Sequence, residues 1–218
     1  MRIIKNMLLL LSIVAVGCGS ATKSFDPEYV KVTNERAQKI VNDLNIADAD
    51  KQLTVRDIIA EQYRNLSWVQ DGRDAKIDAL DQMNLSETEK DKVIEKIETK
   101  AQKDIDKLHK KYINRLEDQL NEQQVVQVKD GMTYGVVPLT YNGYLDMLPE
   151  LTEPQKEVIY EHLVEAREYA MDAGSSDQKH WWFGKYKGKI NNYLSSQGYD
   201  LGKASKEWQA RLKAEKNQ

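Results

Sequence analysis

Apolar residues recur every three to four positions along most of the chain, a period that predicts amphipathic α-helices. The longest stripe has a mean spacing of roughly 3.7 residues, which favours a straight helix with little supercoiling. It consists of Ile94, Ile97, Ala101, Ile105, Leu108, Tyr112, Leu116 and Leu120. Shorter stripes over 27–43 and 55–83 precede it. We therefore expect residues 27–127 to form a long antiparallel helical hairpin or bundle in an all-α fold.

Four short segments carry helix-start signals, in which an apolar residue precedes a capping position and an acid or amide follows. They are IADADK (46–51), LSETEK (85–90), LNEQQV (120–125) and LTEPQK (151–156). Ser86 and Thr152 are predicted N-caps, with Glu89 and Gln155 reaching back to the N–H of the cap residue. Asn121 is the expected cap of a shorter helix.

Residues 128–150 interrupt the helical pattern. The segment is punctuated by glycine and proline and is rich in β-branched residues, which argues against a helix. The breakers are Gly131, Gly135, Pro138, Gly143 and Pro149. Its apolar content is too high for a solvated linker, so we expect an irregular but ordered loop. This loop would be the seam between the N-terminal helices and a C-terminal helical subdomain over 151–218.

The segment KHWWFGKYKGKINNYL (179–194) concentrates aromatic and basic residues. At 100° per residue, one face of the predicted helix forms a core stripe. That stripe consists of Trp182, Phe183, Tyr186, Ile190, Tyr193 and Leu194. Trp181 lies off it, on a face shared with Gly184, Lys185, Gly188 and Asn192. Two interpretations stay open: the indole is a shelf on which a sugar ring stacks, or the glycines admit a neighbouring helix that buries it.

Six residues are therefore candidates for ligand contact: Trp181, Lys185, Asn192, Tyr134, Tyr141 and Tyr144. No catalytic residue can be singled out, and we expect neither a cofactor nor a metal site. Asp106-x-x-His109 has an order compatible with metal binding, but a solvated helix face is the simpler interpretation of the segment DKLHKKY. The sequence lacks a nucleophile elbow, a phosphate loop and a zinc-protease motif.

The first twenty residues, MRIIKNMLLLLSIVAVGCGS, have the organisation of a secretory signal, with a basic start and an apolar run too short to span a bilayer. Ala-Val-Gly-Cys resembles the lipobox of bacterial lipoproteins, so residues 1–17 are expected to be removed and Cys18, the single cysteine, to be lipidated. A tether over 18–26 would then anchor the protein to the outer membrane. The net charge of −3, with both signs mixed along the chain, argues against nucleic-acid binding.

Three segments resemble a family of secreted bacterial lipoproteins known only as domain of unknown function 3826. They are VRDIIAEQYRNL (55–66), VKDGMTYGVVPLTY (128–141) and AREYAMDAGSSDQKHWWFGKYKGKINNYLSSQGYDL (166–201). The family has no established activity, so the resemblance implies no catalytic residues. It does imply an association with polysaccharide-utilisation systems.

LTEPQK is also similar to the Leu-Thr-x-x-Gln motif of the periplasmic chaperone and stress-sensor family typified by Spy and CpxP. That resemblance implies a helical hairpin homodimer that cradles unfolded clients. Our first hypothesis is a non-catalytic, envelope-anchored lipoprotein that binds a glycan or a partner protein of an uptake system. The alternatives are a Spy-like periplasmic chaperone and a carboxylate-dependent enzyme.

Overall fold

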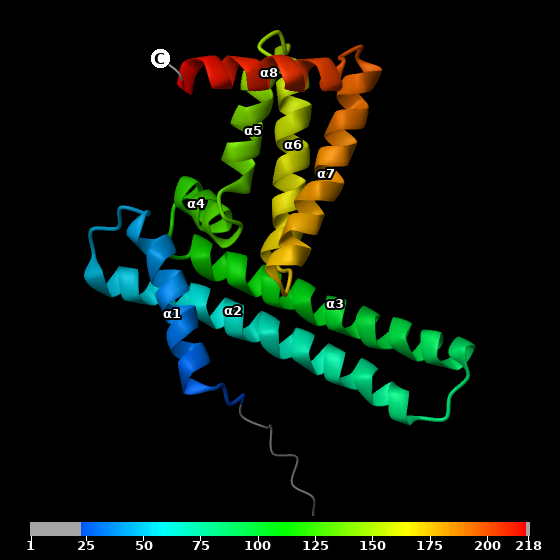
Figure 1. Ribbon diagram of the computed structural model, residues 1–218. Helices are drawn as coiled ribbons and strands as arrows, with labels where there is room; N and C mark the ends of the chain where they lie inside the picture. The colour runs from blue at the N-terminus through cyan, green and yellow to red at the C-terminus, as the bar shows by residue number, and fades with distance from the viewer. Residues whose placement is uncertain (1–22, 217–218) are drawn as a thin grey trace, which may run out of the picture.

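The computed structural model describes residues 23–216, so the signal segment and Cys18 lie outside the described residues. It is 82% helical and has no strand within the described range, which confirms the all-α class (Figure 1). In chain order its elements are α1 (Pro27–Asn42), α2 (Ala49–Asp78), the 3-10 helix η1 (Ala79–Gln82), α3 (Glu87–Glu117), α4 (Glu122–Met132), α5 (Val136–Met147), α6 (Glu153–Met171), α7 (Ser176–Ser196) and α8 (Leu201–Lys216). None of these helices is long and apolar enough to cross a membrane.

Helices α2 and α3 lie side by side and antiparallel, and α1 packs across α2 near the end of the hairpin where α4 follows (Figure 1). The predicted apolar stripe of α3 is buried at that end, through Ala101, Ile105, Tyr112, Leu116 and the following Leu120. Ile94 and Ile97 are only half-buried. At the far end α3 is contacted by α2 and, through the Lys90–Asp81 ion pair, by η1, and part of the stripe is left only half-buried.

Helices α5, α6 and α7 rise from the middle of this hairpin, and α8 lies across their far ends (Figure 1). They enclose a second hydrophobic core, distinct from the core of the hairpin. The predicted core stripe of α7 is confirmed, because Phe183, Tyr186, Ile190 and Leu194 are buried. Trp182 and Tyr193 are partly buried against the same core.

The expectation of an irregular loop over 128–150 is wrong. Helix α4 includes Gly131, and α5 begins one residue after Gly135, so only a short turn separates two helices. The turn is left-handed at two consecutive residues, with φ 59° at Tyr134 and φ 65° at Gly135. Pro138 lies in the first turn of α5, where its missing N–H interrupts no helical hydrogen bond. Gly135 and Pro138 therefore mark the junction between α4 and α5.

The predicted helix starts are confirmed as hydrogen-bonded caps. The backbone N–H of Ser86 donates to Glu89 Oε2 (3.0 Å), and that of Thr152 donates to Gln155 Oε1 (3.0 Å). The Tyr199 hydroxyl also donates to Gln155 Oε1 (2.9 Å), which ties the start of α6 to the turn before α8. The Leu-Thr-x-x-Gln motif therefore has a structural role here, while the Spy-like chaperone function stays a prediction.

Candidate functional site

Two clefts adjoin the connector between α6 and α7, residues 172–175, where the upper helices meet the hairpin. Gln70 of α2 and Ala173 of the connector line both clefts. The Gln70 amide donates to the carbonyl of Asp172 (2.8 Å) and occupies the space that a side chain at Gly174 would need. The connector is thus closely packed on α2. We name the clefts by their lining: the tryptophan cleft contains Trp181, Trp182, His109 and Glu168, and the basic cleft contains Arg36, Lys39 and Lys179.

The tryptophan cleft, of ≈ 560 Å³, presents one open indole and one fixed indole. Trp182 stacks on Tyr169, with ring centroids 4.5 Å apart and an interplanar angle of 15°. Trp181 stands nearly perpendicular to Trp182 and is 58% exposed. Lys185 Nζ lies 5.2 Å and 4.8 Å from the centroids of the two indoles, within cation–π range. Trp181 is therefore contacted by Trp182 and by the Lys185 ammonium, while more than half of its surface faces solvent.

The alternative interpretation of the glycines in α7 is wrong. A Cβ added at Gly184 or Gly188 would meet no heavy atom within 4 Å beyond its own helix. Among the described residues no neighbouring helix approaches either glycine, so the two glycines do not serve helix packing. Because glycine has no side chain, these two positions leave the helix surface beside Trp181 uncovered.

His109 was expected on a solvated face, and this expectation is wrong. Its Nδ1 lies 2.7 Å from Asp172 Oδ2, and its Nε2 lies 3.8 Å from Glu168 Oε2. The hydrogen bond to Asp172 raises the pKa of His109 against the opposing effect of burial, and the charges of Asp172 and Glu168 raise it further. Asp172 Oδ1 is buried and accepts no hydrogen bond from residues 23–216. A charged imidazolium between the two carboxylates balances this local negative charge.

We expect His109 to make the stability of the fold depend on pH. Because its folded pKa lies above the unfolded value, its stabilising contribution is complete below the unfolded pKa and is lost as pH rises through the folded pKa. The free energy of unfolding, measured with urea, should therefore fall as pH rises above about 6.5, the ordinary pKa of histidine. His109→Gln should reduce that dependence, whereas His180→Gln, at an exposed histidine of α7, should leave it unchanged. An unaltered dependence in His109→Gln would contradict this assignment.

A chain of alternating charges extends from the tryptophan cleft into the junction between the helices. Glu168 accepts from Lys129 Nζ (2.8 Å) and lies 3.5 Å from Arg167 Nη2. Arg167 Nη1 in turn donates to Asp130 Oδ1 (2.8 Å). The Arg167 side chain is only 4% exposed, so its charge depends on these two acids. With His109, the chain joins α3, α4 and α6. No local sequence pattern predicts this chain of charges, because most of its paired residues lie in different helices.

The six residues predicted for ligand contact are not gathered into one site. Trp181 and Lys185 are neighbours at the tryptophan cleft, as their shared helix face predicted. Tyr134 lies in the basic cleft and is 60% exposed. Trp181 and Tyr134 therefore lie in two separate clefts, the tryptophan cleft and the basic cleft.

The other three candidates lie away from both clefts. Tyr144 is buried in the upper core, and its hydroxyl donates to Asn191 Oδ1 (2.7 Å). Tyr141 packs edge-on against Tyr160, with ring centroids 5.4 Å apart. Asn192 is exposed farther along α7. Tyr141 and Tyr144 became candidates because 128–150 was expected to be a loop, and as residues of α5 they pack against neighbouring helices.

These features define the class of protein: an all-α domain with two clefts at the junction of a helical hairpin and an upper helical layer. A family model described as a protein of unknown function (DUF3826) matches residues 30–214, and the chain belongs to this family. The resemblance seen in the three sequence segments is thereby confirmed. None of the curated proteins matches the chain.

Proposed function

We propose that this protein is a non-catalytic glycan-binding protein of the cell envelope and an accessory of a polysaccharide-utilisation system. Its lipid anchor would be Cys18, followed by the tether over 18–26. The ligand would be an oligosaccharide in the tryptophan cleft, with Trp181 as the stacking residue.

The exposure of the Trp181 indole carries this proposal. Sugar rings have apolar C–H faces that suit stacking on an indole, while their hydroxyls pair with polar side chains. The tryptophan cleft supplies both, because Arg73, Gln102 and Gln178 line it beside the indole. Its volume of ≈ 560 Å³ falls within the range of about 300–1,000 Å³ found for small-molecule sites.

The polar side chains of the cleft are already held in place. Gln178 Oε1 accepts from the N–H of Gly174 (3.0 Å), and Gln102 Nε2 donates to Asp106 Oδ1 (2.8 Å). Arg73 Nε donates to Asp74 Oδ1 (2.7 Å) and keeps further N–H groups for a ligand. Side chains fixed before binding lose less conformational entropy when the ligand arrives, which favours affinity.

Replacement of Trp181 tests the proposal. We expect Trp181→Ala to weaken oligosaccharide binding about tenfold or more, which corresponds to a loss of about 1.4 kcal/mol of binding free energy. Isothermal titration calorimetry of the purified protein against pectic and other plant oligosaccharides gives the affinity. Trp68→Ala is the matched control, because Trp68 is also an exposed tryptophan (42%) but lies on α2 beside Phe25.

Two results would refute the proposal. One is an absence of binding at millimolar oligosaccharide, and the other is equal binding by the wild type and Trp181→Ala. Chromatography of the same mixtures after long incubation tests the enzymatic alternative. The appearance of shorter products that require Glu168 would replace the non-catalytic function with a carboxylate-dependent one.

A further inference from the structure

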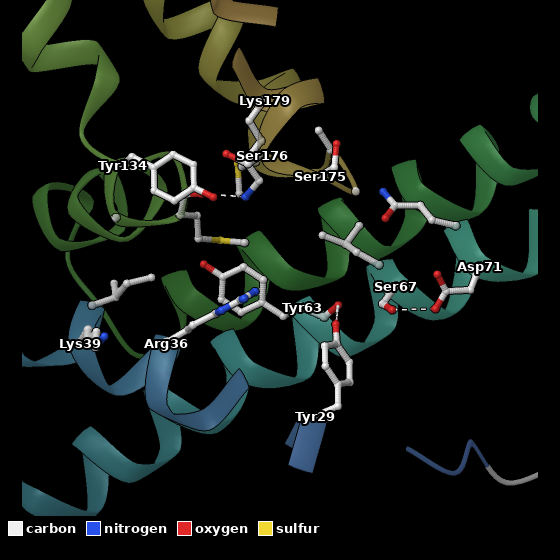
Figure 2. Close-up of a pocket in the computed structure, with 18 residues that line it drawn as sticks. Tyr29, Arg36, Lys39, Tyr63, Ser67, Asp71, Tyr134, Ser175, Ser176 and Lys179 are labelled. Atoms are coloured by element: carbon white, nitrogen blue, oxygen red, sulfur yellow. Dashed lines mark hydrogen bonds between the residues drawn. The ribbon is translucent and has the colours of Figure 1, made fainter. Parts of the chain in front are cut away.

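The basic cleft, of ≈ 650 Å³, is a second cavity that the glycan proposal does not use. Figure 2 shows Lys179 and Tyr134 on one side, with Arg36 and Tyr63 reaching in from α1 and α2 on the other. Ser175 of the connector and Ser176, the first residue of α7, close a third side. The cleft therefore draws its lining from segments far apart in the sequence.

Lys179 is the unusual group in this cleft, because its side chain is buried and forms no ion pair with residues 23–216. The residue is 7% exposed, and its Nζ donates to the carbonyl of Met132 (2.8 Å). The rings of Tyr63 and Tyr134 each lie 5.7 Å from Nζ. An ammonium has three donors, and a single hydrogen bond to residues 23–216 leaves two of them unused. Burying an ammonium without an ionic partner costs free energy, and a bound anion would offset that cost.

Two of the three remaining charged residues of the cleft are also basic. Arg36 and Lys39 line it from α1, and within residues 23–216 neither lies within 4.0 Å of a carboxylate. Asp71 is the acid among the lining residues, and it already accepts a hydrogen bond from Ser67 Oγ (2.8 Å). The first turn of α7 adds the positive end of a helix dipole through Ser175 and Ser176. The cleft thus has an excess of positive charge around a buried ammonium.

We propose that the basic cleft is a second binding site, for a small oxyanion whose charge pairs with Lys179 and Arg36. A carboxylate of an acidic sugar and inorganic phosphate share this chemistry. The tyrosine hydroxyls of the cleft can donate to the same oxygens. This site does not depend on glycan binding at Trp181.

The groups around Lys179 predict how binding varies with pH. Burial lowers the pKa of Lys179 to about 8, Asp172 from the connector after α6 opposes this effect and Arg36 from α1 adds to it. Burial raises the pKa of Tyr63 from α2 to about 12, so that ring stays neutral. Tyr134 faces Nζ from the turn between α4 and α5. Because the oxyanion requires a charged ammonium, its affinity should fall as pH rises from 7 to 9.

Titration with chosen anions tests the second site. Inorganic phosphate, galacturonate and neutral galactose are each titrated into the wild type, Lys179→Met and Lys189→Met. Lys189 is an exposed lysine of the same helix and serves as the matched control. We expect Lys179→Met to weaken anion binding about tenfold or more, Lys189→Met to leave it unchanged, and galactose not to bind in the basic cleft.

The pattern of binding separates the two sources of the anion. Binding of galacturonate alone identifies an acidic sugar, and binding of phosphate alone identifies a phosphate site. Arg36→Met repeats the test at an exposed residue if Lys179→Met does not fold. Trp181→Ala should retain anion binding, which separates this site from the tryptophan cleft. The proposal is overturned if neither anion binds, or if the Lys179 and Arg36 variants bind as tightly as the wild type.

Discussion

Replacing Asp130 with alanine is expected to lower the free energy of unfolding by about 3–5 kcal/mol. Asp130 is the closest acid to the Arg167 guanidinium, at 2.8 Å, and the Arg167 side chain is only 4% exposed. Without Asp130 the buried charge keeps only the longer contact to Glu168, at 3.5 Å. Urea denaturation followed by circular dichroism gives the difference.

An exposed ion pair provides the control for this prediction. Asp104 pairs with Lys100 at 2.8 Å, but the two side chains are 37% and 71% exposed. Asp104→Ala should therefore cost less than about 1 kcal/mol, as is usual for surface ion pairs. If the two variants were destabilised equally, the alternating charges at the junction would contribute no more than surface charges do.

Replacing Phe183 with alanine is the second change for which a large effect is expected. Phe183 is 2% exposed in the upper core, and truncation of a buried phenylalanine typically costs about 3–5 kcal/mol through lost burial and the cavity that remains. Thermal and urea unfolding measure the loss.

The other phenylalanine of the chain is a natural control. Phe25 is only partly buried and meets Trp68 edge-on, with ring centroids 6.0 Å apart. Phe25→Ala should lower the free energy of unfolding by about 1 kcal/mol or less. A similar loss in both variants would mean that the upper core does not hold the fold together as its burial indicates.

Much of the fold was predictable because its causes are local. Capping residues and apolar stripes act over three to four positions, so the starts at Ser86 and Thr152 and the core face of α7 could be derived from the sequence. The error over 128–150 had a local cause too. Glycine and proline were taken as evidence against any helix, whereas Gly135 and Pro138 lie at the end of one turn and in the first turn of a helix.

The clefts could be predicted only in part, because they depend on contacts between distant segments. The helical period places Trp181 off the core stripe, but it leaves open whether a neighbouring helix covers the indole. The structure settles this point, with Trp181 58% exposed. The pairing of His109 with Asp172 joins residues 63 positions apart, and Gln70 bonds to a carbonyl 102 positions away. Lys179 is the first residue of the aromatic segment 179–194. Its burial depends on packing against α2 and α4, and no local sequence pattern predicts that packing.

The shared connector has a consequence for how the two clefts respond together. Asp172 and Ala173 form part of the tryptophan cleft, while Ala173, Gly174 and Ser175 form part of the basic cleft. An occupant that restrained this partition from one side would change the free energy of occupying the other. Thermodynamic linkage makes any such coupling reciprocal: the factor by which an anion alters the affinity for a sugar equals the factor by which the sugar alters the affinity for the anion.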